Sequence, residues 1–243
     1  MAELDLREQV RVYTRGSGSH QPERPDLWPY IPPGSGRVLD VGCATGELGA
    51  ALKGQERARE VVGMELSPVA AAMARARLDD VIEGDLETAE AAYPDGSFDV
   101  LIYADVLEHL KNPWAVAARH RRLLRPGGRV VVSLPNIGHY STLLMLLRQE
   151  WQYQEMGIMD YTHLRFFTRP GVLDLARRAG YEQARLYRRG GEGPKQRLLR
   201  ALTLGRSTDF FIPGFVLVAR NPDAPRDASD AATPAAAGAV RGS

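Results

Sequence analysis

The chain has 243 residues, of which 44% are hydrophobic and 25% charged, with a formal net charge of +1. This length and composition suit one domain with additions and a full apolar core. The balanced charge argues against a nucleic-acid-binding protein. The single cysteine, Cys43, excludes an intrachain disulfide. No apolar run resembles a signal peptide or approaches the about 20 residues of a membrane span, so we expect a cytoplasmic protein without such a span.

The first 36 residues read as an arm that precedes the main domain. Apolar side chains at helical spacing predict a short amphipathic helix over residues 3–13. Tyr13, Arg15 and His20 could form part of a lid over a bound ligand, and a simple surface arm explains the segment equally well.

The rest of the chain alternates strand and helix, which predicts a parallel sheet with crossover helices. Strands are expected near residues 37–41, 60–65, 80–83, 98–103 and 129–134, with a closing pair near 182–189 and 214–220. Helices are expected near 46–54, 68–77, 113–124, 139–149 and 170–180, and a basic helix near 195–204. Residues 125–128 (Arg-Pro-Gly-Gly) read as the turn before the fifth strand.

The most informative segment, residues 37–49, reads as a buried strand, a glycine-rich turn and the start of a helix. This geometry points backbone N–H groups at a ligand beyond the carboxyl end of the strand. The next strand ends at Glu65, 19 positions beyond Gly46. An acidic residue at a spacing of about 20 is typical of a ribose contact, so the pattern predicts an adenosine-binding site.

The turn does not suit a pyrophosphate. Its sequence, Gly42-Cys43-Ala44-Thr45-Gly46-Glu47, departs from the G-x-G-x-x-G spacing. Asp40 and Glu47 flank it, and two carboxylates beside a pyrophosphate would be unfavourable, whereas a cationic ligand tolerates them. S-adenosylmethionine, with its sulfonium and ammonium groups, is such a ligand.

Four further motifs lie in register with this turn: Glu65, Gly84-Asp85-Leu86-Glu87, Phe98-Asp99-Val100-Leu101-Ile102 and residues 123–130. Together, over roughly residues 37–135, they resemble the class I S-adenosylmethionine-dependent methyltransferases. The resemblance implies an α/β, Rossmann-like, seven-stranded and mostly parallel sheet with helices on both faces. It places the methyltransferase domain in residues 37–220, with an insert after the fifth strand. The N-terminal helical arm, residues 1–36, precedes this domain. Residues 221–243 have almost no large apolar side chain and are expected to form a disordered tail.

The resemblance also implies which residues hold the cofactor. Asp40 should bind the ammonium, Glu65 the ribose hydroxyls and Asp85 the adenine amino group. The full implied set is Asp40, Gly42, Ala44, Gly46, Glu65, Leu66, Asp85, Leu86, Tyr103 and Ala104. Ala44 stands where the family usually has glycine. Taken alone, Asp85 would be better explained as a turn residue after Gly84, but beside the other motifs the adenine contact is preferred.

Methyl transfer to a hydroxyl requires aligned reactants and removal of a proton. His139, after the fifth strand, is the preferred base because Pro135 and Asn136 bring the chain to the rim of the sheet just before it. His163 is the second candidate, and His109 is expected to be structural. Capping a helix or bonding the backbone is the alternative role for each of these histidines.

The motifs around these histidines narrow the resemblance to ubiquinone-type O-methyltransferases, and further to those of polysaccharide and natural-product biosynthesis. We therefore expect the insert, residues 136–168, to face a sugar or natural-product hydroxyl. The residues expected to contact the acceptor are Asn136, Tyr140, Trp151, Tyr161 and Arg165.

Asp105, Glu108 and His109 would share one helix face and raise the question of a metal. A helix start with favourable acids is the preferred interpretation, so no metal is expected. The partner is expected to be a small molecule and the protein a monomer or homodimer. N-methylation of an amino sugar or amine, a non-catalytic regulatory partner and RNA methylation remain as alternatives.

Overall fold

The computed structural model of the chain describes residues 22–89, 91–190 and 208–222. Several expected features lie outside these ranges: the helix over residues 3–13, the lid candidates Tyr13, Arg15 and His20, the basic helix near 195–204, and the tail beyond residue 222.

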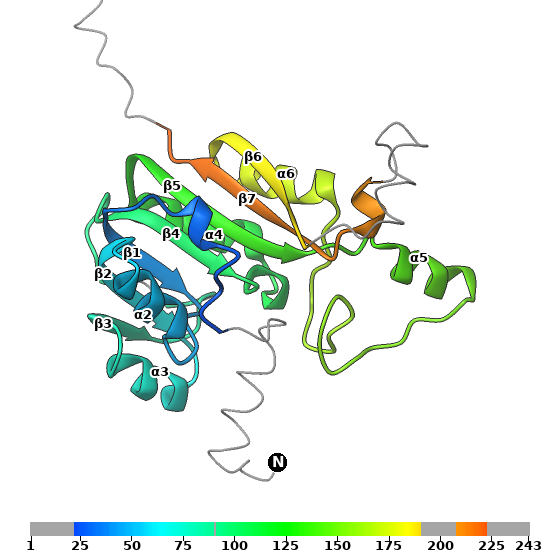
Figure 1. Cartoon of the computed structure of the whole chain (residues 1–243), viewed down its shortest axis with the longest axis horizontal. Coiled ribbons are helices and arrows are strands. Elements are labelled where there is room, and N and C mark those ends of the chain that lie inside the picture. Colours follow the sequence, from blue (N-terminus) through cyan, green and yellow to red (C-terminus); the bar gives the residue numbers. More distant parts are fainter. Residues whose placement is uncertain (1–21, 90, 191–207, 223–243) are drawn as a thin grey trace, which may run out of the picture.

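The core is a seven-stranded sheet with the order β3-β2-β1-β4-β5-β7-β6 (Figure 1). Its strands are β1 (Ser35–Val41), β2 (Ala58–Glu65), β3 (Asp80–Glu83), β4 (Phe98–Ala104), β5 (Leu124–Pro135), β6 (Glu182–Arg189) and β7 (Gly214–Arg220). The first five strands are parallel, and β7 runs antiparallel to both β5 and β6. The predicted Rossmann-like, mostly parallel sheet is confirmed.

The helices begin where local capping signals place them. They are α2 (Glu47–Gly54), α3 (Pro68–Arg75), α4 (Pro113–His120), α5 (Tyr140–Leu147) and α6 (Arg169–Arg178). The Ser67 hydroxyl accepts from the Ala70 N–H before α3, and the Asn112 side chain accepts from the Ala115 N–H before α4. Because α4 ends at His120 and a 3-10 turn follows, the expected helix over 113–124 is shorter than predicted.

Helices cover both faces of the sheet, as expected, because the strands alternate their side chains between two apolar layers. One layer joins Leu39 and Leu101 to Val116 of α4 and Leu175 of α6. The opposite layer contains Val38, Val61 and Val100 from the strands, Leu48 and Leu52 from α2, and Ala71 and Ala74 from α3. Because β1, β4 and β5 are parallel neighbours, their carboxyl ends lie together at one edge of the sheet, between these two layers.

Two features differ from the expected boundaries. β5 begins at Leu124, so residues 125–128 belong to the strand rather than to a preceding turn. Asn221, expected to begin the disordered tail, is held in the fold: its amide donates to the Leu124 carbonyl at 2.7 Å and accepts from Arg121 at 3.1 Å. The described chain is therefore held in the fold at least as far as Asn221.

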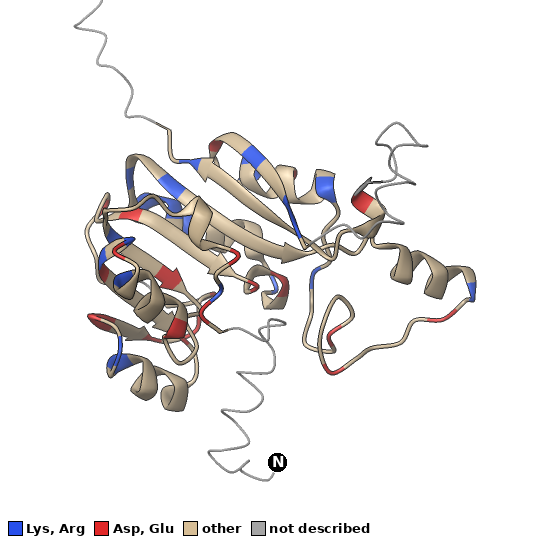
Figure 2. Cartoon of the chain, viewed as in Figure 1, with Lys and Arg blue, Asp and Glu red and all other residues tan. Residues whose placement is uncertain are grey.

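The insert after β5 projects from the body of the molecule, with α5 at its outer side (Figure 1). α5 carries no charged residue (Figure 2), and Leu143, Leu144, Leu146 and Leu147 on it are 45 to 71% exposed. Within the described ranges, no helix has the length and apolar composition that crossing a bilayer requires.

Candidate functional site

Asp40, one residue before the end of β1, carries a buried carboxylate. Neither of its oxygens has a hydrogen-bond partner among the described residues. Burial raises the pKa of Asp40 to about 7; the charge of Arg24 opposes the shift, while Glu65 and Glu47 add to it. Leaving a carboxylate buried and unpaired costs stability, so this position suits a cationic ligand.

The turn after β1 is held in an unusual backbone conformation. Gly42, Ala44 and Gly46 all have positive φ angles, of 73°, 48° and 84°. A side chain on Gly42 would lie 2.6 Å from the Cγ2 atom of Val106. The turn therefore lies directly against the segment that follows β4, and only glycine fits at its first position.

Glu65, the last residue of β2, is anchored beside this turn. Its Oε1 accepts from the Ser67 N–H at 2.8 Å and its Oε2 from the Ala44 N–H at 3.0 Å. Burial raises the pKa of Glu65, and these two N–H groups oppose the shift. Each carboxylate oxygen can still accept a second hydrogen bond, as a ribose diol requires. The adjacent Leu66 is exposed and offers an apolar contact.

Asp85 lies in a turn after β3, where its Oδ1 accepts from the Glu87 N–H at 2.8 Å. The turn interpretation therefore accounts for one of its oxygens. The Asp85 side chain is exposed, and Leu86 beside it is buried.

Tyr103 does not present its side chain at this edge, contrary to expectation. Its ring is buried in the core layer, and its hydroxyl lies 3.1 Å from Nδ1 of His120. Strand alternation is the reason, because Tyr103 faces the layer with α4 while Ala104 packs on the opposite layer. Of the two expected residues, only Ala104 points away from that core layer.

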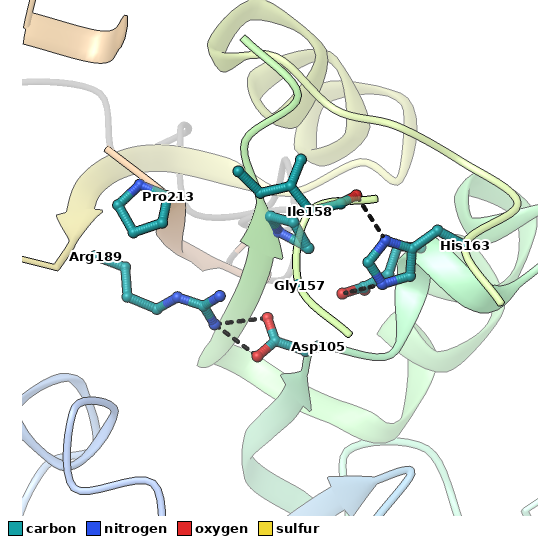
Figure 3. Close-up of a pocket in the computed structure, with 8 residues that line it drawn as sticks. Asp105, Gly157, Ile158, His163, Arg189 and Pro213 are labelled. Atoms are coloured by element: carbon teal, nitrogen blue, oxygen red, sulfur yellow. Dashed lines mark hydrogen bonds and ion pairs between the residues drawn. The ribbon is translucent and has the colours of Figure 1, made fainter. Parts of the chain in front are cut away.

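A pocket opens at the carboxyl ends of β4 and β5 (Figure 3). It is lined by Asp105, Glu108, Pro135, Gly157, Ile158, His163, Arg189 and Pro213. Because β4 lies between β1 and β5, this pocket is next to the turn that follows β1. Ligands of open α/β sheets bind at this edge.

Asp105 is the centre of a buried charge cluster in the pocket wall. It accepts from Arg24 at 3.0 Å, from Arg189 at 2.6 and 2.7 Å, and from the Ser133 hydroxyl at 2.7 Å. Burial alone would raise the pKa of Asp105, but the charges of Arg189 and Arg24 outweigh it and hold the pKa below its usual value. The Asp105 carboxylate is thus paired with both Arg24 and Arg189.

The expected helix face of Asp105, Glu108 and His109 is absent. Asp105 has φ 58° and lies before a single 3-10 turn, Leu107–His109, so the three residues do not share a helix. Burial, followed by the charge of Asp105, raises the pKa of Glu108 well above its usual value. Glu108 lines the pocket, whereas His109 lies behind it against Thr162.

Of the two candidate bases, His163 is the one found in the described lining of the pocket. His163 lines the pocket, with Nδ1 3.1 Å from the Ile158 carbonyl and Nε2 4.0 Å from Oε1 of Glu108 (Figure 3). His139 is absent from the described lining and instead caps α5, where its Nδ1 accepts from the Ser141 N–H at 3.3 Å. Burial lowers the pKa of His139.

The expected acceptor contacts in the insert do not converge on this pocket. Asn136 is buried, and its amide donates to the carbonyls of Asp209 and Ile212 at 2.7 and 2.9 Å. Arg165 donates to the Lys111 carbonyl at 3.0 Å. These two side chains therefore hold the backbone. The rings of Tyr140, Trp151 and Tyr161 are exposed on the insert, outside the described lining of the pocket.

Sequence reasoning missed Arg24, Ser133 and Arg189. Arg24 belongs to the arm, and Arg189 ends a strand distant in sequence, so neither carried a local signal. Ser133 did: it is a hydroxyl inside the apolar run Val130–Leu134, near the end of a buried strand.

Comparison with known proteins places this geometry among methyltransferases. Residues 16–185 match the profile of a family described as "Methyltransferase domain". A ubiquinone biosynthesis O-methyltransferase of Ralstonia nicotianae is 34% identical over 197 residues, covering 78% of each chain. The corresponding Thiobacillus denitrificans protein is 34% identical over 156 residues. The chain spans only 66% of that relative's length and 60% of the Cereibacter sphaeroides relatives.

Solved structures share the fold at low sequence identity. A SAM-dependent methyltransferase from Archaeoglobus fulgidus aligns over 80% of this chain and 90% of its own, with a TM-score of 0.59 and 16% identity. Phosphoethanolamine N-methyltransferase 2 of Haemonchus contortus, solved with S-adenosyl-L-methionine, aligns over 89% of this chain and 57% of its own, with a TM-score of 0.59 and 17% identity. At this identity the likeness shows the fold alone.

Proposed function

This chain belongs to the class I S-adenosylmethionine-dependent methyltransferases, and from that premise we propose that it methylates a small-molecule hydroxyl held at the pocket beyond β4 and β5. The observation that carries the proposal is Asp40: a buried carboxylate without a described partner, beside a turn whose backbone is left-handed at three positions. The Asp40 carboxylate can pair with a cationic ligand, and the turn beside it is next to the pocket.

The residues at the ends of β1 and β2 fit S-adenosylmethionine. When bound, it supplies an electrophilic methyl group on a sulfonium. We assign the ammonium to Asp40, the ribose hydroxyls to Glu65, and the methionine portion to the backbone of Gly42, Ala44 and Gly46 and to Ala104. Leu66, Asp85 and Leu86 remain our assignments for the adenosine end. Arg24, which lies close enough to Asp40 to affect its pKa, also hydrogen-bonds Asp105 and so connects this site to the pocket.

We assign activation of the acceptor hydroxyl to His163 and Glu108. Both side chains are buried and both line the pocket. Neither carboxylate oxygen of Glu108 has a hydrogen-bond partner in the described part of the chain. A hydroxyl must lose its proton during methyl transfer, which a group at the pocket wall can assist. His139 caps a helix outside this wall, so we no longer assign the proton transfer to it.

The acceptor class is proposed from two sources. The motifs of the insert favour a sugar or natural-product hydroxyl, and the relatives named for ubiquinone biosynthesis favour a phenolic ring. The apolar side chains of Pro135, Ile158 and Pro213 in the pocket lining support a ring-bearing, partly apolar molecule. We therefore place phenols and catechols first, followed by nucleotide sugars.

Calorimetry with S-adenosylmethionine tests the cofactor assignment. Replacing Glu65 by alanine removes a charged acceptor for two hydroxyls, so we expect affinity to fall about 10- to 100-fold. Glu60→Ala is the matched control, because Glu60 lies on the same strand and pairs with Arg37 away from the carboxyl ends. Equal affinity in both variants would remove Glu65 from the site.

A methyl-transfer screen read by mass spectrometry tests the reaction. We expect a phenol, catechol or sugar hydroxyl to gain one methyl group, and the turnover to fall in His163→Ala. Methylation confined to amines would establish N-methylation instead. Cofactor binding without transfer to any acceptor would favour the regulatory alternative.

A further inference from the structure

The turn after β3, which is assigned to the adenosine end of the cofactor, uses most of its own polar groups internally. The Asp85 carbonyl accepts from the N–H groups of Thr88 and Ala89 at 3.0 and 2.6 Å. Oδ1 of Asp85 accepts from the Glu87 N–H at 2.8 Å. The Leu86 N–H has no hydrogen-bond partner in the described part of the chain. One N–H donor and the second Asp85 oxygen, Oδ2, are therefore left for a ligand.

Two further carbonyls of this turn are held by one side chain, Arg119. Its Nη1 donates to the Glu87 carbonyl at 3.0 Å, and its Nη2 donates to the Leu86 carbonyl. Arg119 lies in the last turn of α4, more than 30 positions away in the sequence. The other end of this helix also contributes, because the N–H of its cap residue Asn112 donates to Oε1 of Glu87 at 2.8 Å. Helix α4 therefore holds the turn from both of its ends.

The helix that provides these contacts is itself fixed on the sheet. Val116 of α4 and the Leu86 side chain belong to the same buried core layer. His120, next to Arg119, lies with its Nδ1 3.1 Å from the Tyr103 hydroxyl of β4. Arg119 thus connects a rigid helix to a turn whose backbone carries the free N–H group.

The environment of Arg119 strengthens its grip on the turn. The side chain is half-buried, and within the described residues its partners are carbonyls rather than an acid. Hydrogen bonds from an ionised donor are about twice as strong as those between neutral groups. Arg122, one helical turn later, differs in this respect: it is exposed and pairs with Asp95 at 2.8 Å.

We propose that Arg119 is a positioning residue for recognition of the adenine ring. The peptide group that carries the Leu86 N–H is fixed through the Asp85 carbonyl, and Arg119 fixes the two peptide groups that follow it. The Leu86 N–H and Asp85 Oδ2 then meet the ring N1 and the amino group of adenine without rearrangement, which lowers the cost of binding. This role rests on the adenosine contacts proposed above.

Calorimetry with S-adenosylhomocysteine and S-inosylhomocysteine tests this role. In the inosine compound an oxo group replaces the adenine amino group and N1 carries a proton, so both contacts become mismatched. We expect the wild-type chain to bind the adenosine compound about 30-fold more tightly or better. In Arg119→Met the adenosine compound should bind about 10-fold more weakly, and the ratio of the two affinities should fall below about 5. A general loss of stability would lower both affinities equally and leave the ratio unchanged.

Arg122→Met is the matched control. Arg122 donates to the carbonyls of Ala91 and Tyr93 at 3.2 and 3.3 Å, in the same loop between β3 and β4 but beyond the adenine turn. Both affinities should stay within about twofold of the wild type in this variant. Arg119→Lys keeps the charge and can reach one carbonyl, so its ratio should lie between those of the wild type and Arg119→Met. Thermal unfolding shows which variants are folded, and Arg119→Lys carries the test if Arg119→Met is not.

A wild-type ratio in folded Arg119→Met, or an equal fall of the ratio in Arg122→Met, would overturn the role of Arg119. Asp85→Ala separates this outcome from a failure of the adenosine assignment. A lowered ratio in Asp85→Ala beside a wild-type ratio in Arg119→Met removes Arg119 alone. A wild-type chain without preference for the adenosine compound would remove the contacts of Asp85 and Leu86 together with the role of Arg119. These measurements need no acceptor, so they are independent of methyl transfer.

Discussion

The Arg24 guanidinium donates a hydrogen bond of 3.0 Å to the Asp105 carboxylate across 81 positions of sequence. Both side chains are nearly inaccessible, with 3% and 5% of their surface exposed. Arg24 also donates to the Ser133 hydroxyl at 3.0 Å, and Arg189 approaches the same carboxylate from β6. The segment before β1 is thereby attached to the ends of β4, β5 and β6, between the two halves of the site.

Loss of this contact should be costly. Arg24→Met removes one of the two cations that balance Asp105, and breaking a buried pair costs about 3 kcal/mol of unfolding free energy. Arg37→Met is the control, because Arg37 pairs with Glu60 at the surface, where we expect a loss below about 1 kcal/mol. Urea denaturation measures both. Equal losses would mean that the Arg24 contact contributes no more than a surface pair.

Asp40 should make the stability of the free protein depend on pH. Its folded pKa of about 7 lies above its unfolded value of about 3.9, so the folded state binds more protons between these limits. Stability therefore falls as pH rises from about 4 to about 7, by an amount on the order of a few kcal/mol. Asp40→Asn should abolish this decline and be more stable than the wild type above pH 7. A wild-type curve without the decline would contradict the buried, unpaired carboxylate.

The affinity for S-adenosylmethionine should depend on pH through Asp40 in the direction opposite to that of stability. Only the ionised Asp40 pairs with an ammonium, so wild-type affinity for S-adenosylmethionine should rise as pH increases through about 7. In Asp40→Asn the affinity should be weaker and lack this rise. Calorimetry at pH 6 and pH 8 distinguishes the two. A parallel rise in the variant would assign the titration to another group.

Two glycines with similar backbone angles test the close approach of the turn to the segment after β4. Gly42 and Gly34 have φ angles of 73° and 71°, but only Gly42 would bring a side chain into contact, with Val106. Gly34→Ala should cost about 1 kcal/mol for the left-handed backbone alone. Gly42→Ala should cost about 1 to 3 kcal/mol more because of overpacking. Equal unfolding free energies would show that the turn does not lie against Val106.

Replacing His139 should mainly lower stability, whereas replacing His163 should mainly lower kcat. His139→Ala removes the cap of α5, which should cost about 1 kcal/mol of stability and change kcat only a few fold. His163→Ala should lower kcat by about 100-fold or more, since His163 lines the pocket. Steady-state kinetics with an acceptor identified by the screen, together with denaturation, compare them. A hundredfold loss of kcat in His139→Ala would restore it as the base.

Much of the fold could be predicted because its signals are local. The β-branched run 130–134 marked the central strand, and Ser67-Pro68 marked the start of α3. Boundaries were less accurate: β5 starts at Leu124 because Leu124, five residues before the expected strand, already pairs with Phe98 of β4. The face of Tyr103 could have been inferred from strand alternation, whereas its contact with His120 depends on where α4 packs.

The histidines show the limit of such reasoning. His139 follows the end of β5 closely in the sequence, but position along the chain does not specify where a side chain points. The helix that begins at Tyr140 uses His139 as its cap, and the chain then returns through the insert to place His163 beside Glu108. That return path has no periodic pattern from which it could be read.

The sequence by itself determined the alternating strands and helices of a mostly parallel sheet, the glycine-rich turn after β1, and the acids Asp40 and Glu65 at the ends of β1 and β2. These features depend on local backbone preferences and on the period of the strands. Only the tertiary structure decided that Arg24 and Arg189 share Asp105, and that His109 and His163 meet at Glu108. Such contacts join segments far apart in the chain, and they form only when packing of the insert and the arm against the sheet brings those segments together.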